Sequence, residues 1–441
     1  MADATRSATR RGPNSPITIG THQVKPGERR DVSLPVARLY TATSLEMPVK
    51  VLCGRRAGPV LFVSAAIHGD ELNGVEIIRR LFRRKALSGL RGTLLAVPIV
   101  NVHGFIEQSR YLPDRRDLNR SFPGSPTGSI AARLARTFLD NVVLKSNFGI
   151  DLHTGAIDRA NLPQIRGDMD DSDIAEMAHA FGAPVAVNAS MRDGSLRACA
   201  AQNGIPVMVY EAGEALRFDE LSIRAGVRGI VQVMRRLGML PELKRGGRTH
   251  TVVARTTRWV RAPSSGIVTP AAELGHRVSK GDRLALICDP LGGMEADVVA
   301  PIDGIVIQID VEEGETVIAG TTNIPGSTMM VIADPSETLT EVRVDEADIA
   351  QVEIGQQADI YAAAYPDTAL VGTVQSIAAV ARQTPGQQSL SFLVKILLDE
   401  QDELKIRPGM SVRADIYTQS AEETLAVPVQ AVLYDESSGE E

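Results

Sequence analysis

The stretch that decides the fold is Pro59-Val-Leu-Phe-Val-Ser-Ala-Ala-Ile-His68-Gly-Asp-Glu71. It begins as a run of apolar and small residues and ends with an imidazole and two carboxyl groups. Successive residues of a strand point to opposite faces of the sheet. A short run in which nearly all residues are apolar is therefore typical of a strand that is buried on both faces. The polar residues that follow it therefore lie at the carboxyl end of a buried strand, where ligands bind in open α/β sheets.

Further apolar runs of this kind recur between Pro16 and about Leu240. Three of them are Thr93–Val100, Asn147–Leu152 and Ile205–Tyr210. Helical patterns separate the runs, for example over about Gly69–Ser88 and Ser129–Lys145. A closing helix has apolar residues at i, i+3, i+4 and i+7 spacing, namely Val227, Ile230, Val231 and Met234. This alternation predicts a mostly parallel α/β sheet.

Beyond about residue 245 the helical patterns almost vanish and the apolar period becomes two. Ala262-Pro-Ser-Ser-Gly-Ile-Val268 returns as Ala300-Pro-Ile-Asp-Gly-Ile-Val306, which predicts a small β sandwich of two interlocking halves. We therefore expect five parts: a disordered leader (1–15), an α/β domain (16–245), a sandwich (250–335), a second β domain (336–432) and an acidic tail (433–441).

The composition of the 441 residues excludes several classes of protein. With 44% hydrophobic residues and a net charge of -7, the chain is not mainly disordered. No apolar run approaches the roughly 18 residues of a spanning helix, and the basic start lacks the apolar stretch of a secretory signal. The cysteines Cys53, Cys199 and Cys288 are odd in number and far apart, which excludes a disulfide framework and favours a reducing, cytoplasmic compartment.

Acidic residues are concentrated towards the C-terminal end. From Ser336 onward there are 19 acidic and 6 basic residues, so the part before Ser336 carries a net positive charge. Such asymmetry supports separate domains. The acidic region and the single tryptophan, Trp259, argue against nucleic acid as a partner, because phosphates need basic groups and bases need aromatic surfaces.

Three residues could bind one metal ion. His68 and Glu71 stand three apart in a strand-to-helix turn, and His153 follows another buried strand. Zinc accepts two imidazoles and a carboxylate and keeps an open position for water in catalytic sites. The alternative for His68, taken alone, is a histidine that only caps the end of a strand.

Other polar groups suggest what such a metal would act on. Asn119 and Arg120 are adjacent in a loop, and an amide beside a guanidinium can bind an anionic substrate. Glu211 stands at the carboxyl end of a strand, and a carboxylate beside a metal-bound water is the usual general base. Glu214 is the rival base, although it lies further into the loop.

Four motifs occur in a familiar order: His68-x-x-Glu71, Asp117-Leu-Asn-Arg120, Asp151-Leu-His153 and Tyr210-Glu-Ala-Gly213. Over about residues 16–240 they resemble the succinylglutamate desuccinylase/aspartoacylase family of the zinc carboxypeptidase clan, and the predicted deacylase subgroup most of all. The resemblance implies an α/β zinc-carboxypeptidase-like domain.

The same resemblance implies a role for each site residue. It implies zinc bound by His68, Glu71 and His153, with Glu211 as the base. It also implies that Asn119 and Arg120 hold the substrate carboxylate. An arginine polarises the scissile carbonyl in this family; Arg110 matches it best, and Arg116 stays an alternative that could also contact substrate.

The β region has its own resemblance. From Trp259 it is similar to the barrel-sandwich appendage of the predicted deacylases, which is itself similar to biotinyl and lipoyl carriers. From about Ile302, Val311-Glu-Glu-Gly-Glu-Thr-Val317 and Val344-Asp-Glu-Ala-Asp-Ile349 resemble HlyD-type membrane fusion (periplasmic adaptor) proteins. These resemblances imply an all-β, lipoyl-like barrel-sandwich hybrid followed by a small β-barrel domain. Without the N-terminal anchor and helical hairpin of the adaptors, we expect no direct membrane anchor.

The function that we expect is zinc-dependent cleavage of the amide bond of an N-acylated, amino-acid-like small molecule. A carboxypeptidase-like peptidase would use the same parts. The competing class is a non-enzymatic adaptor or scaffold, in which the β domains dominate. The sequence leaves open whether the chain forms a homo-oligomer.

Overall fold

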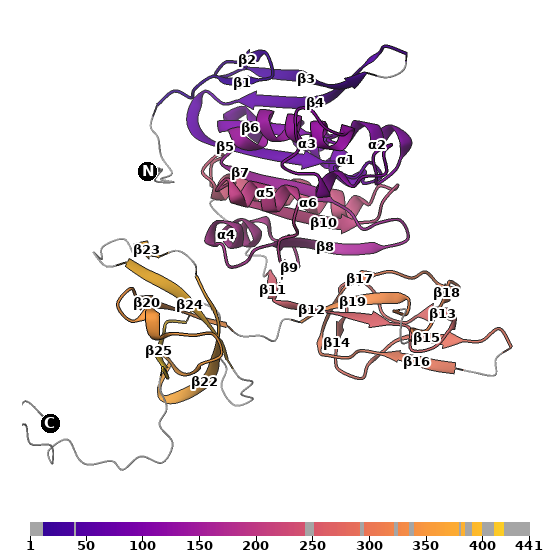
Figure 1. Ribbon diagram of the computed structural model, residues 1–441, viewed down its shortest axis with the longest axis vertical. Helices are drawn as coiled ribbons and strands as arrows, with labels where there is room; N and C mark the ends of the chain where they lie inside the picture. The colour runs from indigo at the N-terminus through magenta and orange to yellow at the C-terminus, as the bar shows by residue number, and fades with distance from the viewer. Residues whose placement is uncertain are drawn as a thin grey trace, which may run out of the picture. The chain divides into compact units, whose positions relative to one another are not determined.

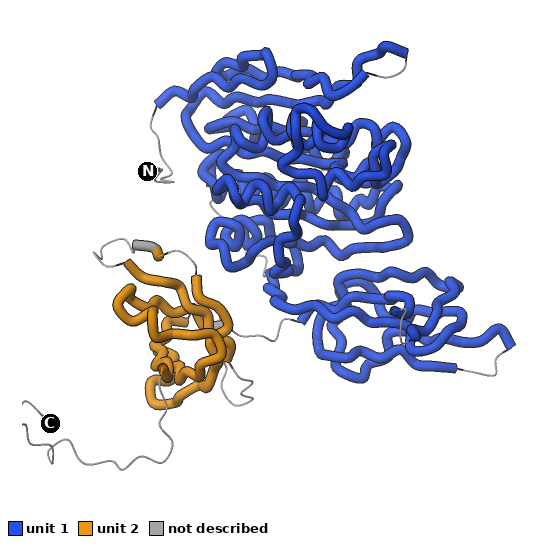
Figure 2. Tube along the Cα trace, viewed as in Figure 1, with its two compact units in different colours: residues 1–336 blue, residues 337–441 orange. Residues whose placement is uncertain are grey.

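The computed structural model describes residues 12–38, 41–242, 251–291, 295–321, 325–334, 339–378, 381–383, 390–398 and 410–418. The chain divides into two compact units, residues 1–336 and 337–441 (Figures 1 and 2). The finer division of the first unit at about residue 245 stays a prediction. The expected acidic tail lies outside the described residues, as do residues 1–11 of the expected leader. Asn14 of that leader donates hydrogen bonds to the carbonyls of Gly54 and Gly92, so the folded part begins before Pro16.

A large sheet forms the centre of unit 1 (Figure 1). Its middle strands run parallel in the order β6 (Arg91–Val97), β5 (Arg56–Ala65), β7 (Phe148–His153) and β10 (Val207–Gly213). The flanking strands are antiparallel to them, with β4 (Ser44–Cys53) and β3 (Arg29–Arg38) beside β6, and β8 (Ala160–Gly167) beside β10. The prediction of a mostly parallel sheet is therefore wrong outside the middle. The link 154–159 from β7 to β8 is too short for the crossover that a parallel strand needs.

Helices cover both faces of this sheet. They are α1 (Asn73–Leu81), α2 (Val102–Glu107), α3 (Ile130–Asn141), α4 (Ser172–Phe181), α5 (Leu196–Gln202) and α6 (Glu220–Arg236). The short elements are β1 (Ile17–Ile19), β2 (His22–Val24), β9 (Val185–Asn188), η1 (Lys85–Gly89), η2 (Leu118–Arg120) and η3 (Val143–Lys145). Alternate side chains of β5 point to opposite faces of the sheet. Leu61 and Val63 pack in the core that contains α1, α4 and α6, and Phe62 packs in the core that contains α3 and α5.

The helix after β5 is shorter than its pattern predicts. The expected helix over about Gly69–Ser88 is wrong at both ends, because α1 covers only Asn73–Leu81. It ends early since Arg84 has an extended ψ of 125°, after which η1 begins. It starts late because residues 68–72 form the turn that carries the polar groups. The apolar stripe of the closing helix is confirmed, since Val227, Ile230, Val231 and Met234 are buried in α6.

The sandwich confirms the two interlocking halves. Its strands are β12 (Thr256–Arg261), β13 (Gly266–Pro270), β14 (Arg277–Val278), β15 (Arg283–Cys288), β16 (Glu295–Val299), β17 (Gly304–Ile309), β18 (Thr316–Val317) and β19 (Thr328–Asp334). The first strand of each repeat pairs with the second strand of the other repeat, β13 with β18 and β17 with β14. The repeats turn at equivalent glycines, Gly275 and Gly314, both with a φ of +84° that other residues rarely adopt.

The sandwich continues the large sheet rather than standing apart from it. Strand β17 pairs with β8, and β11 (Val252–Ala254) pairs with β9. Val185 and Val187 of β9 form a separate buried apolar cluster with Ile305 and Ile307 of β17. One hydrogen-bonded sheet therefore runs from β3 to β12.

Unit 2 is a nearly closed β sheet. Its elements are β20 (Leu339–Asp345), η4 (Ile349–Gln351), β21 (Gln357–Ala362), β22 (Tyr365–Ile377), β23 (Arg382–Gln383), β24 (Leu390–Leu398) and β25 (Val412–Ile416). The strands follow the order β20-β24-β22-β21-β25. Ile360, Val374, Val394 and Ile396 form its core. Within the described parts of the chain, no helix combines the length and the apolar character needed to cross a membrane.

We expect residues 1–336 to fold without unit 2, because the apolar core of each unit is built from its own residues. Calorimetry should show the unit 1 transition at nearly the same temperature in the full chain and in residues 1–336. Loss of that transition on shortening would mean that unit 2 is integral to the first fold.

Candidate active site

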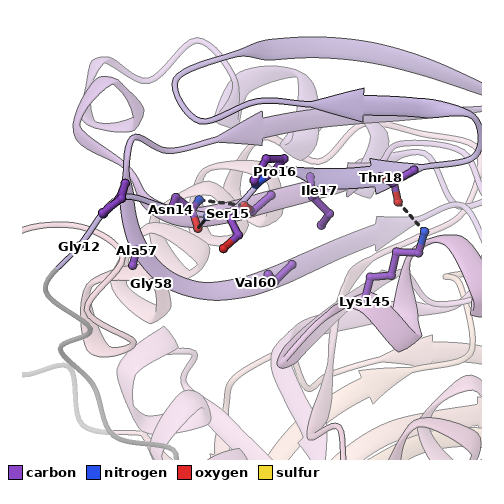
Figure 3. Close-up of a pocket in the computed structure, with 12 residues that line it drawn as sticks. Gly12, Asn14, Ser15, Pro16, Ile17, Thr18, Ala57, Gly58, Val60 and Lys145 are labelled. Carbon is purple, nitrogen blue, oxygen red and sulfur yellow. Dashed lines mark hydrogen bonds between the residues drawn. The ribbon is translucent and has the colours of Figure 1, made fainter.

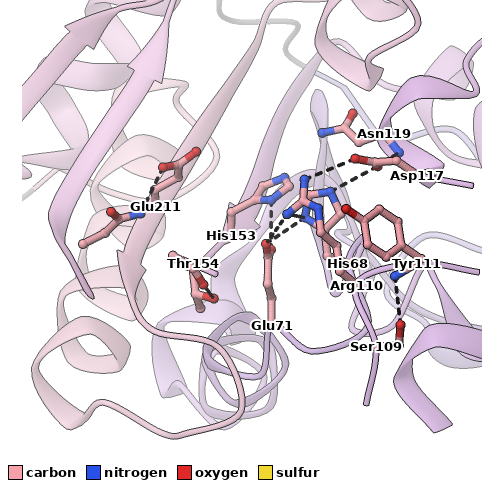
Figure 4. Close-up of polar contacts among 12 residues, drawn as sticks. His68, Glu71, Ser109, Arg110, Tyr111, Asp117, Asn119, His153, Thr154 and Glu211 are labelled. Carbon is pink, nitrogen blue, oxygen red and sulfur yellow. Dashed lines mark hydrogen bonds and ion pairs between the residues drawn. The ribbon is translucent and has the colours of Figure 1, made fainter. Parts of the chain in front are cut away.

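The polar residues singled out in the sequence gather at the carboxyl ends of three parallel strands (Figure 4). His68 and Glu71 follow β5, His153 is the last residue of β7, and Glu211 lies near the end of β10. Strand register brings them together, since Glu211 pairs with His153 across β10 and β7. The strand ends therefore place two imidazoles and two carboxylates in one region.

His68, Glu71 and His153 converge on one point. His68 Nδ1 lies 2.7 Å from Glu71 Oε1, and His153 Nδ1 lies 2.9 Å from Glu71 Oε2. One donor atom from each residue lies within 4.8 Å of the others, and all three residues are buried. Among the described residues, Glu71 Oε2 has no partner other than His153. This donor set fits a zinc ion, because two imidazole nitrogens and a carboxylate oxygen leave a fourth position open.

Each imidazole has a second carboxylate on its other side. Asp117 Oδ1 lies 3.3 Å from His68 Nε2, and Asp151 Oδ2 lies 2.8 Å from His153 Nε2. Asp151 also accepts a hydrogen bond of 2.6 Å from Ser64 on β5. These contacts turn the Nδ1 atoms of both rings towards Glu71, the arrangement by which carboxylates orient histidine ligands of metals.

The charges in this cluster shift several pKa values. Burial would raise the pKa of Glu71, but His68 and His153 lower it well below its usual range. Burial would lower the pKa of both imidazoles, but Glu71 raises the two values, with further help from Asp117 beside His68 and from Asp151 beside His153. Protons therefore compete with a metal ion for both rings at a higher pH than they would at an ordinary histidine.

Arg110 reaches the cluster (Figure 4), whereas the contacts of Arg116 lie outside it. One guanidinium nitrogen of Arg110 lies 3.3 Å from His68 Nδ1, and the other donates to Asp117 at 3.2 Å. Arg116 is 63% exposed in its side chain and contacts Asp114 and Ser129 instead. Of the two arginines that the sequence left open, the geometry favours Arg110 as the one near the metal-ligand candidates.

Asn119 and Arg120 lie in η2, next to Asp117. The side-chain oxygen of Asn119 accepts a hydrogen bond of 2.9 Å from the backbone of Leu196 and so links η2 to the start of α5. The exposed guanidinium of Arg120 folds back on the Asn119 carbonyl at 2.6 Å. Asn119 and Arg120 thus share the loop of Asp117, and among the described residues no hydrogen bond or ion pair joins the Arg120 side chain to the metal-ligand candidates.

The surroundings of Glu211 and Glu214 differ. Glu211 is half-buried, accepts a hydrogen bond of 3.1 Å from Asn161 and lies 3.8 Å from Arg166. Glu214 is buried and holds the loop before β8, because it accepts from the Asp158 backbone at 3.1 Å. Neither Asn161 nor Arg166 was predicted from the sequence. Both lie on β8, and they reach Glu211 only because β8 pairs with β10, a neighbour relation that no sequence motif indicates.

A pocket of about 710 Å³ lies elsewhere (Figure 3). It is lined by residues such as Asn14, Thr18 and Val60, near the start of β5 and not its end. Lys145, the charged residue of its lining, donates to the Thr18 carbonyl. None of the metal-ligand candidates borders it.

Comparison with known proteins identifies the parts of the chain. Residues 57–237 match the family model described as the succinylglutamate desuccinylase/aspartoacylase catalytic domain. By this match, residues 57–237 are similar to that catalytic domain. Residues 256–325 match the barrel-sandwich hybrid domain of RND membrane fusion proteins, and residues 338–419 match an AprE-like β-barrel domain. These matches confirm the resemblances, and the membrane-fusion likeness begins at residue 256, earlier than Ile302.

Individual relatives agree with the catalytic domain. The N-alpha-acetyl-L-2,4-diaminobutyric acid deacetylase of Halomonas elongata is 25% identical over 283 residues, which cover 62% of this chain and 82% of that protein. A succinylglutamate desuccinylase/aspartoacylase structure from Rhodobacter sphaeroides has a TM-score of 0.58 and 26% identity, covering 70% of this chain and 96% of that one. The product-bound ectoine utilization protein EutE (DoeB) of Ruegeria pomeroyi shares the fold, with a TM-score of 0.61, 23% identity, and coverage of 73% and 100%.

If the cluster binds metal, we expect one zinc ion per chain and its loss in His68→Ala and His153→Ala. Elemental analysis of dialysed protein measures the stoichiometry. His179→Ala, an exposed histidine on α4, is the matched control and should keep the zinc. Stoichiometric zinc in folded His68→Ala and His153→Ala would rule the ligand set out.

Zinc affinity should fall as the pH is lowered, because protons compete for the Nδ1 atoms. Glu71 and the neighbouring carboxylates raise the pKa of His68 and His153 in the metal-free protein, so the loss should begin above about pH 6.5, the ordinary value for histidine. A chelator competition titration between about pH 6 and pH 8 measures this. An affinity that stays constant over this range would contradict the shift.

Proposed function

We propose that this protein is a zinc-dependent hydrolase that cleaves the amide bond of an N-acylated, amino-acid-like small molecule. The catalytic domain belongs to a family of deacylases, and a deacetylase of N-acetylated diaminobutyric acid is among the relatives. The observation that carries the proposal is the buried convergence of His68, Glu71 and His153, with Glu211 and Arg110 beside it.

In this proposal His68, Glu71 and His153 hold the zinc. When bound, zinc lowers the pKa of a coordinated water towards about 7 and polarises a carbonyl group. Asp117 and Asp151 keep both rings turned towards the ion, and the burial of the three ligands excludes competing solvent.

Glu211 is the proposed general base. It takes a proton from the attacking water and returns it to the leaving amine, as a carboxylate at this position can do in metal-assisted hydrolysis. Its half-buried carboxylate faces the same strand edge as His153, which supports the assignment. Glu214 is the weaker candidate because its carboxylate holds the Asp158 backbone.

Arg110 is the proposed donor to the carbonyl oxygen of the scissile amide, where negative charge develops. Its guanidinium lies beside the proposed metal ligands. The guanidinium of Arg116 points to Ser129 instead, so Arg116 would contact only the outer part of an anionic substrate. Asn119 and Arg120 bind the substrate carboxylate, and the exposure of Arg120 lets it meet the anion on entry.

Two alternatives keep some support. A carboxypeptidase-like peptidase would use the same residues on a longer substrate. An adaptor or scaffold role is favoured by residues 256–325 and 338–419, which match domains of membrane fusion and AprE-like proteins.

We propose a reducing, cytoplasmic location for the protein. All three cysteines are free, which supports this proposal.

Release of amine from a panel of N-acetyl and N-succinyl amino acids tests the proposal, with short peptides as the comparison. We expect the zinc-loaded protein to favour the acyl amino acids. Glu211→Gln should keep its zinc and lose about 10²-fold or more in turnover, since it can no longer accept the proton. Glu214→Gln keeps an oxygen that can accept from Asp158, so it is the matched control and should change turnover only slightly.

The other outcomes are informative. Faster cleavage of peptides would favour the peptidase. Zinc-loaded protein without activity on either panel would favour the scaffold. A large loss in Glu214→Gln with normal turnover in Glu211→Gln would transfer the role of base to Glu214.

A further inference from the structure

Strand β8 joins the candidate base to the sandwich. On one side it pairs with β10, where Gln164 lies opposite Glu211. On the other side it pairs with β17, where Asn161 lies opposite Gln308 and Ala160 opposite Ile309. The strand is therefore shared between the catalytic domain and the sandwich.

Asn161 makes the one side-chain hydrogen bond to Glu211 among the described residues. Its Nδ2 donates to Glu211 Oε2 at 3.1 Å, and Asn161 is only 3% exposed. The donor occupies one oxygen of the carboxylate and leaves Oε1 to exchange a proton. Arg166 lies further from the same oxygen, at 3.8 Å, so the buried amide of Asn161 is the nearer of the two groups that orient the carboxylate.

Asn161 is paired with a neighbouring strand on each of its edges. The ladder between β8 and β10 shifts register between Glu211 and Gly213, the point at which Asn161 pairs. On the β17 side the pairing at Asn161 is regular. Asn161 is therefore held from both sides, and its pairing with β17 is the one on which no bulge falls.

Two further contacts hold β17 against the catalytic domain. Ile305 and Ile307 pack with Val185 and Val187 of β9 in a buried cluster. Asp310, which follows β17 and has a side chain only 2% exposed, lies 4.0 Å from Arg159 in the loop before β8. The apolar cluster anchors the strand from one face, and the long ion pair adds a weaker contact at its end.

We propose that Asn161 is a positioning residue for Glu211 and that β17 of the sandwich holds Asn161 in place. The sandwich is then a working part of the hydrolase and not an appended scaffold. The inference rests on the proposed role of Glu211 as the base.

The test uses full-length, zinc-loaded protein and compares two substitutions at one position. Asn161→Ala removes the donor and should lower kcat about tenfold to a hundredfold, the scale for a misplaced catalytic group, with KM and zinc content unchanged. Asn161→Asp keeps the shape but places a second carboxylate against Glu211, so its kcat should be lower still. Asn188→Ala, on β9, is the matched control and should leave kcat unchanged.

A second pair of variants tests the role of the sandwich. Ile307 faces the cluster shared with β9, whereas its neighbour Val306 faces the core of the sandwich itself. Ile307→Ala should lower kcat at constant KM and add little to the loss in Asn161→Ala, because both act through the same hydrogen bond. Val306→Ala should lower thermal stability and leave kcat unchanged.

Each outcome bears on one claim. Normal kcat in Asn161→Ala, beside inactive Glu211→Gln, overturns the positioning role while the proposed function stands. Active Glu211→Gln overturns the proposed function itself. If Asn161→Ala fails to fold, Asn161→Asp decides, and a kcat equal to the unmodified protein overturns the inference. Equal kcat losses in Ile307→Ala and Val306→Ala overturn the role of β17.

Discussion

The carboxylate of Glu71, buried between the imidazoles of His68 and His153, is the interaction on which the rest of the catalytic domain depends. A buried carboxylate is costly to desolvate unless charged or hydrogen-bonding partners surround it. Here each of its oxygens faces an imidazole, and each imidazole has a further carboxylate on its other nitrogen. The arrangement exists only if β5 and β7 end side by side, so the parallel pairing of these strands is a condition for the site.

The surroundings of that cluster follow from the same condition. The turn at residues 68–72 brings the Glu71 carboxylate against the His68 ring. Because these residues form the turn, α1 begins later than its apolar pattern indicates. Beyond β10 the sheet becomes antiparallel at β8 and then continues into the sandwich through β17. Two stretches that match different families, residues 57–237 and 256–325, thus share one hydrogen-bonded sheet.

Much of the site could be predicted because its residues are local in the sequence. His68 and Glu71 lie in one turn, and both His153 and Glu211 sit at the ends of apolar runs whose strand character is plain. The interlocking sandwich was also predictable, because a repeat of seven residues at Ala262 and Ala300 is visible without an alignment. The preference for Arg110 over Arg116 rested on the family resemblance alone, since both lie in one loop and only its path decides which guanidinium turns inward.

The sequence by itself determined the chemistry: which side chains end the buried strands, and therefore that imidazoles and carboxylates meet at one edge of the sheet. Local spacing and apolar periodicity are sufficient for that, because strand and helix patterns repeat over a few residues. Only the tertiary structure decided the orientation of those groups. Asp117 turns His68, Asp151 turns His153, and Asn161 reaches Glu211 across the β8–β10 pair. Such contacts depend on strand order and register, which arise from pairing between segments far apart in the chain.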